Sequence, residues 1–289
     1  MKRYVRTDLA CEREGSLARY EYAEQGCRVC EVKERAEGRS ALYTTVHFVC
    51  LEDADAMERQ RAARAVARVL KRTADRLAPH TDCVLVACLG NARVTPDSLG
   101  HHTAACLEVT RHVQLLDAAA FSRFGRGALC LVEPGVMGDT GVEAAELVRG
   151  VAREVGAGLV VVVDALAACR CDHLYATVQI CDRGLQPGSG VRAGVRRVAI
   201  DAVSVGCPVI SMGIPTVIDS ATLICDALFR AGICGVGDAL SRHLAQSCGY
   251  VVAPVQTDLL VARGGALLAE AIGECLGQGG GYNHARRHI

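Results

Sequence analysis

The sequence contains no tryptophan and only four phenylalanines in 289 residues. Val, Leu, Ile and Ala must therefore fill most of the core. The chain has no excess charge of either sign, because 32 basic residues balance 32 acidic ones, whereas a dedicated nucleic-acid-binding protein needs an excess of basic residues. No uninterrupted apolar run approaches the roughly 20 residues that cross a bilayer. These absences predict a soluble globular protein that contacts neither nucleic acid nor a membrane.

An apolar signal segment is missing as well, because residues 1–8 are charged. We therefore expect the sixteen cysteines to be free thiols in a reducing cytoplasm, where many of them fill the core as small hydrophobic side chains. Cys27 and Cys30 have the spacing of a zinc knuckle, but a structural zinc site needs four ligands, and no second pair follows at the right distance. The cysteines predict neither a disulfide framework nor a zinc site.

Apolar strands alternate with amphipathic helices along most of the chain. Continuous runs of Val, Leu and Ile bounded by Gly or Pro are typical of strands that helices cover on both faces. We therefore expect one α/β domain over residues 1–289, built on a doubly wound, mostly parallel sheet with helices on both faces. The expected strands are 40–51, 83–89, 128–133, 158–164, 174–181 and 207–212, and the expected helices are 56–78, 99–116, 141–155, 217–230 and 257–276.

Two segments lack this periodicity. Residues 182–206 form the longest irregular stretch, and long loops beside an α/β sheet often carry function. The glycine-rich stretch 277–281 is followed by a polar end. We expect residues 277–289 to be a loose tail.

Two apolar strands each run into an aspartate beside small residues. The run 84–89 leads to Asp97, and the run 160–163 ends on Asp164. Because ligands and catalytic groups gather beyond the carboxyl ends of parallel strands, the two carboxylates are expected to face one cleft. Each aspartate alone also fits a structural role, Asp97 as the cap of the following helix and Asp164 as the cap of a loop. Taken together, the pair indicates hydrolysis by two carboxylates.

Longer strings around these aspartates resemble the germination protease of endospore-forming bacteria. They agree in order and approximate spacing over about residues 80–230, and YVRTDLA at 4–10 matches as well. The strings are CLGN at 88–91, VTPDSLG at 94–100, PGVMGDTG at 134–141, DALAA at 164–168, TVQI at 177–180, PGSGV at 187–191 and GIPTVID at 213–219. The chain departs from the family pattern at Cys169, where an arginine is expected, and in its shorter early and late segments.

The resemblance implies an endopeptidase that hydrolyses small acid-soluble spore proteins during germination. It also implies a zymogen, a homotetramer in the spore core of the cytoplasm, and a fold related to that of the nickel–iron hydrogenase maturation peptidases. Asp97 and Asp164 match the two aspartates that have been proposed as the family's catalytic pair. The resemblance places further residues around the cleft, namely Gly90, Asn91, Gly135, Gly138, Gly141, Gln179, Gly188, Ser189 and, as a third acidic candidate, Asp219.

Two neighbouring carboxylates can divide the roles of acid and base. They do not ionise together easily, so one keeps a proton near neutral pH while the other accepts a proton from water. The sequence does not decide which aspartate is the base. Backbone N–H groups of the turns at 90–91 and 135–141 are candidate donors to the oxyanion that forms during attack on a peptide carbonyl. This mechanism requires no cofactor.

Two alternatives stay open. A metal-dependent maturation endopeptidase of the same fold would use Asp97 and Asp164 as ligands of a divalent ion, together with His101, His102 or His173. A non-catalytic α/β binding protein would keep the fold without needing the aspartates, and both aspartates are present. We therefore expect a metal-free peptidase.

The N-terminal string 7–12 resembles the family's substrate site, which is an acidic residue followed by an apolar one, Ala, a small residue and Glu. A cut at a chain terminus breaks few buried contacts. We therefore predict autoprocessing between Asp8 and Leu9. This cut would release residues 1–8 as a short propeptide and free the cleft.

Overall fold

The computed structural model describes residues 6–13, 18–36, 39–79, 81–124, 127–186, 198–233, 237–246 and 250–275. Within these ranges the chain forms one sheet in the order β1-β2-β3-β7-β8-β6-β4-β5, with β9 paired to β8. The strands are β1 (Ala18–Glu24), β2 (Cys27–Ala36), β3 (Arg39–His47), β4 (Cys83–Cys88), β5 (Ala128–Val132), β6 (Leu159–Ala168), β7 (Thr177–Cys181), β8 (Val209–Asp219) and β9 (Val251–Val252).

The sheet has a parallel half and an antiparallel half. β5, β4, β6 and β8 are parallel neighbours, whereas β7, β3, β2 and β1 extend the sheet from β8 in antiparallel order. The α/β class is confirmed, but the sheet is mixed where the sequence predicts a mostly parallel one. The antiparallel half begins with the hairpin β1–β2, and most of β1 is exposed, so it has no continuous apolar run to mark it.

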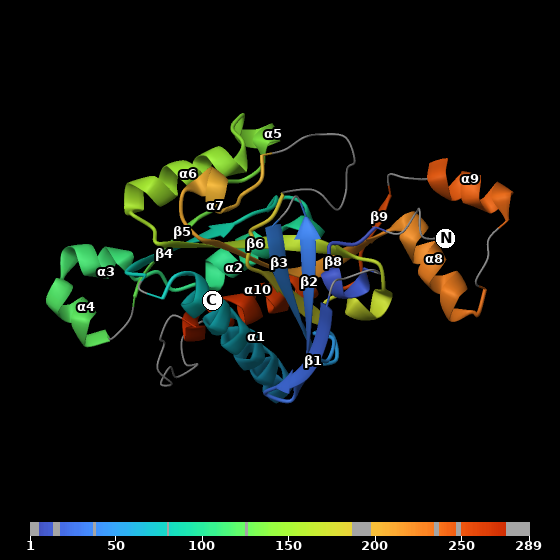
Figure 1. Ribbon diagram of the computed structural model, residues 1–289, viewed down its shortest axis with the longest axis horizontal. Coiled ribbons are helices and arrows are strands. Elements are labelled where there is room, and N and C mark those ends of the chain that lie inside the picture. The colour runs from blue at the N-terminus through green and yellow to red at the C-terminus, as the bar shows by residue number, and fades with distance from the viewer. Residues whose placement is uncertain are drawn as a thin grey trace.

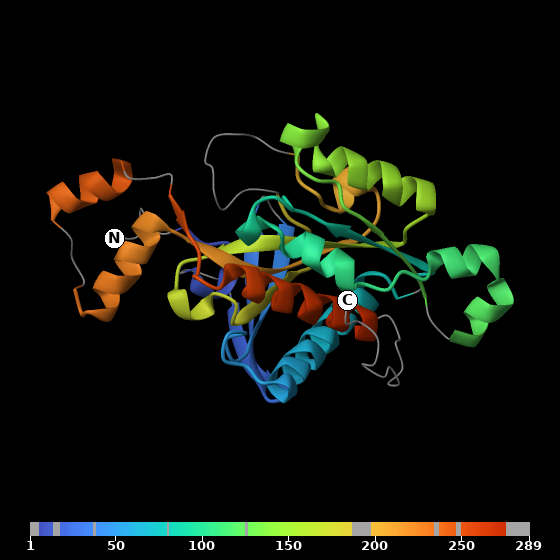
Figure 2. The same cartoon turned by 180° about the vertical axis from the view of Figure 1, so that it is seen from behind.

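Helices cover both faces of the sheet, as predicted (Figures 1 and 2). The helices α1 (Ala56–Leu77), α2 (Leu99–Cys106) and α10 (Thr257–Cys275) pack on one face. The helices α6 (Ala144–Val155) and α7 (Ala202–Val205) cover the other face over the parallel strands. In β4, Val84 and Val86 point to the first layer and Leu85 to the second. The central parallel strands are therefore apolar on both sides.

Among the predicted elements that differ from the structure, the helix 99–116 and the strand 207–212 differ most. The expected helix 99–116 is broken, because α2 ends at Cys106 and α3 (Arg111–Leu116) follows after an extended link. In that link the N–H of Thr110 donates to the carbonyl oxygen of Leu129 in β5, and the N–H of Leu129 donates to the hydroxyl of Thr110, at 2.9 Å each. The expected strand 207–212 continues through Pro215 to Asp219, because β6 beside it also continues, and α8 (Ser220–Arg230) begins only afterwards.

Peripheral helices lie at the two ends of the molecule (Figures 1 and 2). The helices α3 and α4 (Ala118–Phe124) lie at one end, and α8 and α9 (Asp238–Gln246) lie at the other. None of the helices in the described ranges has the length and apolar character of a membrane span. The centre of the expected loop, residues 187–197, and the expected tail, 277–289, lie outside the described residues.

Candidate active site

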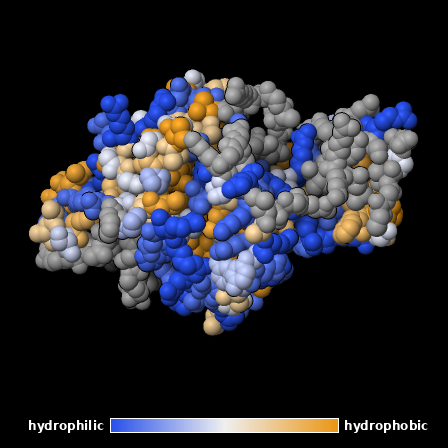
Figure 3. Space-filling model, viewed as in Figure 1, coloured by the Kyte–Doolittle hydropathy of each residue, from blue (hydrophilic) through white to orange (hydrophobic). Residues whose placement is uncertain are grey.

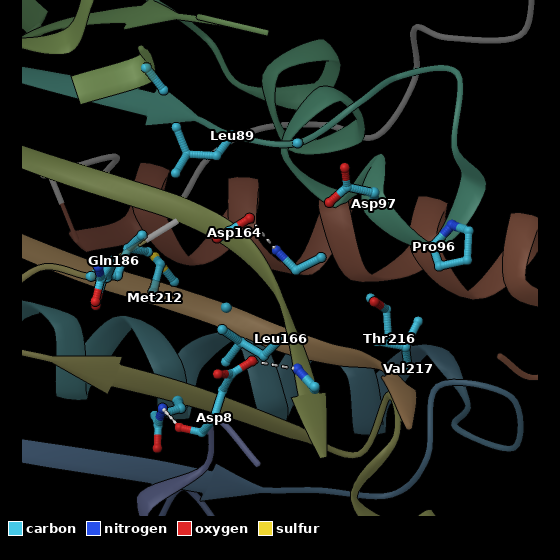
Figure 4. A pocket seen from close by; sticks show the side chains of 18 of the residues that line it. Asp8, Leu89, Pro96, Asp97, Asp164, Leu166, Gln186, Met212, Thr216 and Val217 are labelled. Carbon is cyan, nitrogen blue, oxygen red and sulfur yellow. Dashed lines mark hydrogen bonds between the residues drawn. The ribbon is translucent and has the colours of Figure 1, made fainter. Parts of the chain in front are cut away.

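A pocket of about 720 Å³ lies at the carboxyl ends of the parallel strands. Its walls come from β6, β8, the loops after β4 and β5, and the N-terminal segment. Figure 4 shows Asp97 and Asp164 on its wall, with Asp8 farther along, beyond Leu166. The structure therefore brings the two aspartates of the predicted pair to one pocket.

Asp97 reaches the pocket from a tight loop after β4. The loop ends in a 3₁₀ turn, Thr95–Asp97, in which Pro96 restricts the backbone. The carboxylate Oδ2 and the backbone oxygen of Asp97 both accept hydrogen bonds from the N–H of Asn91, at 2.9 and 3.1 Å. The residue that caps α2 is Ser98. The alternative role of Asp97 as a helix cap is therefore wrong, and its carboxylate is held by its own loop.

Asp164 lies inside β6, not at the end of the strand. β6 continues to Ala168 beside β8, but on its other side β4 ends at Cys88, which pairs with Val163. Asp164 is the next residue along β6. Its Oδ1 accepts a hydrogen bond from the N–H of Ala165 at 3.0 Å. Asp164 thus lies just beyond the carboxyl end of β4, which is where ligands of α/β sheets gather. Its carboxylate lines the pocket there.

Two glycines allow the backbone to approach the aspartates closely. Gly90 has a φ of +110°, and a Cβ atom on it would lie 2.0 Å from the backbone oxygen of Asp97. A Cβ atom on Gly213 would lie 2.2 Å from the backbone oxygen of Asp164. Only glycine fits these positions without a shift of the neighbouring backbone. Gly90 thus supports the site as expected, and Gly213 adds a residue that was not predicted.

We expect Gly90→Ala to lower the free energy of unfolding by about 3–5 kcal/mol, because the new methyl group adds a backbone clash to the strain of a positive φ. Gly156→Ala is the matched control. Gly156 has a φ of +67° and open space at its Cβ position, so this change should cost about 1 kcal/mol. Urea unfolding of the two variants measures the difference. Equal losses would contradict the close contact between Gly90 and the Asp97 loop.

The other predicted cleft residues divide into three groups. Gly135 and Gln179 line the pocket. Gly188 and Ser189 lie outside the described residues. Asn91, Gly138 and Gly141 do not line the pocket, although residues close to them in the sequence do.

Asp219 has a structural role. It ends β8, and its Oδ1 accepts hydrogen bonds from the N–H groups of Ala221 and Thr222, at 3.1 Å each, at the start of α8. Such caps satisfy the free N–H groups of a helix N-terminus. Asp219 does not line the pocket, so the expectation of a third acidic cleft residue is corrected.

The turns that were expected to supply oxyanion donors use several of their N–H groups internally. Asn91 donates to Asp97, as described above. In the short helix α5 (Met137–Thr140), Thr140 donates to the carbonyl oxygen of Val136, and Gly141 donates to that of Met137. This part of the prediction is wrong for these groups, because they already have acceptors within the turns.

The N-terminal segment is bound beside the pocket. We call residues 7–12 the latch. The N–H of Asp8 donates to the carbonyl oxygen of Ala167 at 2.9 Å, and the N–H of Ala167 donates to Oδ2 of Asp8 at 2.8 Å. Gln179 donates to the Asp8 carbonyl oxygen at 2.9 Å and accepts from the N–H of Ala10 at 2.7 Å. Leu9 and Ala10 are buried. The expectation that a cut after Asp8 breaks few buried contacts is therefore wrong.

Glu12 anchors the other end of the latch. Its side chain is 1% exposed and accepts hydrogen bonds from the N–H groups of Cys169 and Arg170, at 2.8 and 3.1 Å. It is also bound by Nδ1 of His173 at 2.6 Å and by the hydroxyl of Thr7. Burial raises the pKa of Glu12, but the hydrogen bonds from His173 and Thr7 outweigh it and hold the pKa below its ordinary value. Glu12 is thus bound as a carboxylate.

Within the described ranges, no three His, Cys, Asp or Glu side chains come together in one cluster that could hold a metal ion. Nδ1 of His101 contacts Glu133 at 2.9 Å, and His173 is bound to Glu12. Cys27 and Cys30 belong to different hydrophobic clusters, since an odd spacing along β2 places them on opposite faces. The fourteen cysteines that the structure describes are free thiols.

Several functional residues escaped sequence reasoning. Ala167 binds the latch and Glu12 anchors it; Ala167 belongs to the DALAA string and Glu12 to the string 7–12, but neither string indicates that these two segments meet. Gly213 and Thr216 line the pocket and belong to the GIPTVID string. That string was the available signal for both residues.

A comparison with family models matches residues 20–231 to the germination protease peptidase family. Relatives named germination protease are 36% identical in Caldanaerobacter subterraneus over 239 residues, 35% in Priestia megaterium over 215 residues and 33% in Clostridium acetobutylicum over 243 residues. These matches cover 78%, 72% and 78% of this chain and 72%, 57% and 73% of the relatives.

Among solved structures, a nickel–iron hydrogenase maturation protease from Thermococcus kodakarensis matches with a TM-score of 0.38 and 17% identity, over 72% of this chain and 98% of that protein. The family model matches well over half of the chain, and the matched range includes most of the residues that line the pocket, among them Asp97 and Asp164. The protein therefore belongs to the germination protease family of peptidases.

Proposed function

We propose that the protein is an endopeptidase that cuts small acid-soluble spore proteins during germination, with Asp97 and Asp164 as its catalytic pair. The observation that carries this proposal is the arrival of both carboxylates in one pocket. One carboxylate takes a proton from the attacking water, and the other, protonated, gives a proton to the leaving amine. The match to germination proteases supports a peptidase of spore germination, and the substrate class is what the resemblance to that family implies. No metal takes part in the proposed reaction.

We also propose that the protein is made as a zymogen that is cut between Asp8 and Leu9. Asp8 pairs with Ala167, three positions beyond Asp164 along β6. At a rise of about 3.3 Å per residue, this places the pairing point about 10 Å from Asp164 along the strand. The bound latch thus keeps its own cleavage site away from the aspartates while Asp8 occupies part of the pocket wall. Processing therefore requires the latch to dissociate from Ala167 and Gln179.

We propose further that the protein forms a homotetramer in the spore core. Large apolar side chains are exposed on the peripheral helices, with Leu115 and Leu116 on α3 and Phe229 on α8. Figure 3 shows hydrophobic surface at both of these ends of the molecule. Exposed apolar surface of this kind favours association between copies of the chain.

Cleavage of a purified, unstructured small acid-soluble spore protein tests the function. We expect the processed enzyme to cut it at the same rate before and after thorough chelation, because the reaction uses only the two carboxylates. Loss of activity in chelator, restored by one divalent ion, would establish the metal-dependent alternative. A processed enzyme that cuts no such protein under either condition would favour the non-catalytic alternative.

A further inference from the structure

Thr216 carries a buried hydroxyl group in the pocket wall. It is 1% exposed, lines the pocket, and its Oγ1 has no hydrogen-bond partner among the described residues. Two other buried threonines are satisfied, since Thr73 donates to the carbonyl oxygen of Val69 and Thr103 to that of Leu99, at 2.9 Å each. The buried hydroxyl of Thr45 also lacks a partner among the described residues, but Thr45 does not line the pocket. A buried hydroxyl without a partner is unfavourable and rare in folded proteins. A ligand that brings an oxygen into the pocket would satisfy it.

A β-bulge places Thr216 at this position. In the pairing of β6 with β8, Leu166 is opposite Pro215 and Ala167 is opposite Val217, so Thr216 is the extra residue. Bulges redirect a side chain and are frequent beside active sites. In Figure 4 the hydroxyl oxygen of Thr216 is on the side that faces Asp97. The bulge therefore directs this group toward the catalytic pair.

We propose that Thr216 donates a hydrogen bond from Oγ1 to the carbonyl oxygen of the peptide bond that is cut. This proposal rests on the proposed function. The hydroxyl is available as a donor because its Oγ1 has no partner among the described residues, whereas the N–H groups of Asn91, Thr140 and Gly141 already have acceptors in their turns. An extended peptide, in turn, brings a carbonyl oxygen at every residue.

The hydrogen bond strengthens as the reaction proceeds. When water attacks the carbonyl carbon, the new C–O bond forms and the π electrons of the carbonyl group move onto its oxygen. The water proton goes to the carboxylate that acts as base. When the C–N bond breaks, these electrons return, and the amine leaves with the proton of the carboxylic acid. Thr216 keeps its own proton throughout and stabilises the negative oxygen.

Thr216→Val, Thr216→Ser and the control Thr73→Val test this role in the processed enzyme. We expect Thr216→Val to lower kcat for a spore-protein peptide by about 10²-fold with little change in KM, as for loss of one oxyanion donor. Thr216→Ser should restore kcat to within about 5-fold of the wild type, because serine keeps the donor. Thr73 lies in α1 and does not line the pocket, so Thr73→Val should leave kcat unchanged.

Thermal unfolding gives a second, independent measurement. Removing an unsatisfied buried hydroxyl should raise the melting temperature of Thr216→Val by about 2–4 °C. Thr73→Val loses a formed hydrogen bond, so its melting temperature should not rise. An unchanged kcat in Thr216→Val, a rise in KM alone, or a serine variant as slow as valine would overturn the role of Thr216 but leave the peptidase intact. A wild type that cuts nothing would overturn the proposed function, and the role of Thr216 with it.

Discussion

Asp97→Asn and Asp164→Asn should each lower the rate of peptide cleavage by about 10²–10⁴-fold while leaving the fold intact. Each change removes one half of the acid–base pair but keeps the size of the side chain. Cleavage of a spore-protein peptide measures the rate, and circular dichroism checks the fold. Mass spectrometry of the full chain at mildly acidic pH gives a further readout. The wild type should yield a species that begins at Leu9, and neither variant should do so.

Asp75→Asn is the matched control for this experiment. Asp75 is exposed on α1 and pairs with Lys71 at 3.0 Å, so its loss should leave the rate unchanged. A variant of Asp97 or Asp164 with near wild-type turnover would exclude that residue from catalysis. Fully active enzyme that still begins at Met1 would show that the cut after Asp8 is not needed for activity.

Glu12→Gln should release the latch and lower the amide hydrogen-exchange protection of residues 8–12 by at least about 10²-fold. The carboxylate accepts from four donors, and glutamine replaces one accepting oxygen with an NH₂ group that faces donors. Breaking such a buried charged contact costs about 3–5 kcal/mol, and the loss appears as local opening.

The binding of the latch by Glu12 in the wild type should also weaken in strong acid. Because the pKa of Glu12 lies below its ordinary value of 4.5, its contribution is complete above that pH and is lost as the pH falls through the lowered pKa.

Glu34→Gln provides the comparison for the latch. Glu34 pairs with Arg13 at 2.9 Å on a partly exposed surface, where an ion pair contributes little, so exchange of residues 8–12 should barely change. The released latch of Glu12→Gln should also be cut faster between Asp8 and Leu9. Unchanged exchange in Glu12→Gln would show that Glu12 does not hold the latch.

The parallel half of the sheet could be predicted from the sequence because its strands are apolar on both faces. The run 160–163 in β6 is one such segment, and α1 begins and ends within one residue of its prediction. β1 and β2 could not be found in this way, since their exposed face is polar and the turn between them consists of Gln25 and Gly26, both with positive φ. The bulge at Thr216 depends on the register between two strands, which a single sequence does not specify.

The site was predictable where the chain itself brings a residue to the end of the parallel ladder, as for Asp97 and Asp164. It was not predictable where distant segments meet. Gln179 was expected in the cleft, but its two hydrogen bonds to the latch depend on a contact across 171 and 169 residues of chain. Asp219 shows the opposite error, because its place in a matching string could not distinguish a cleft residue from a helix cap.

The residues that bind the latch lie in β6 and in the segment that follows it, before β8 in the sequence. Their position has a consequence during synthesis of the chain. Ala167, Cys169, Arg170, His173 and Gln179 all leave the ribosome before Val209, where β8 begins. Residues 7–12 emerge earlier still. Since a chain is translated from its N-terminus, all of these partners of the latch have been made before β8 and Val251, which complete the pocket wall. A newly made chain therefore has no interval in which the pocket is complete and the latch lacks its binding site.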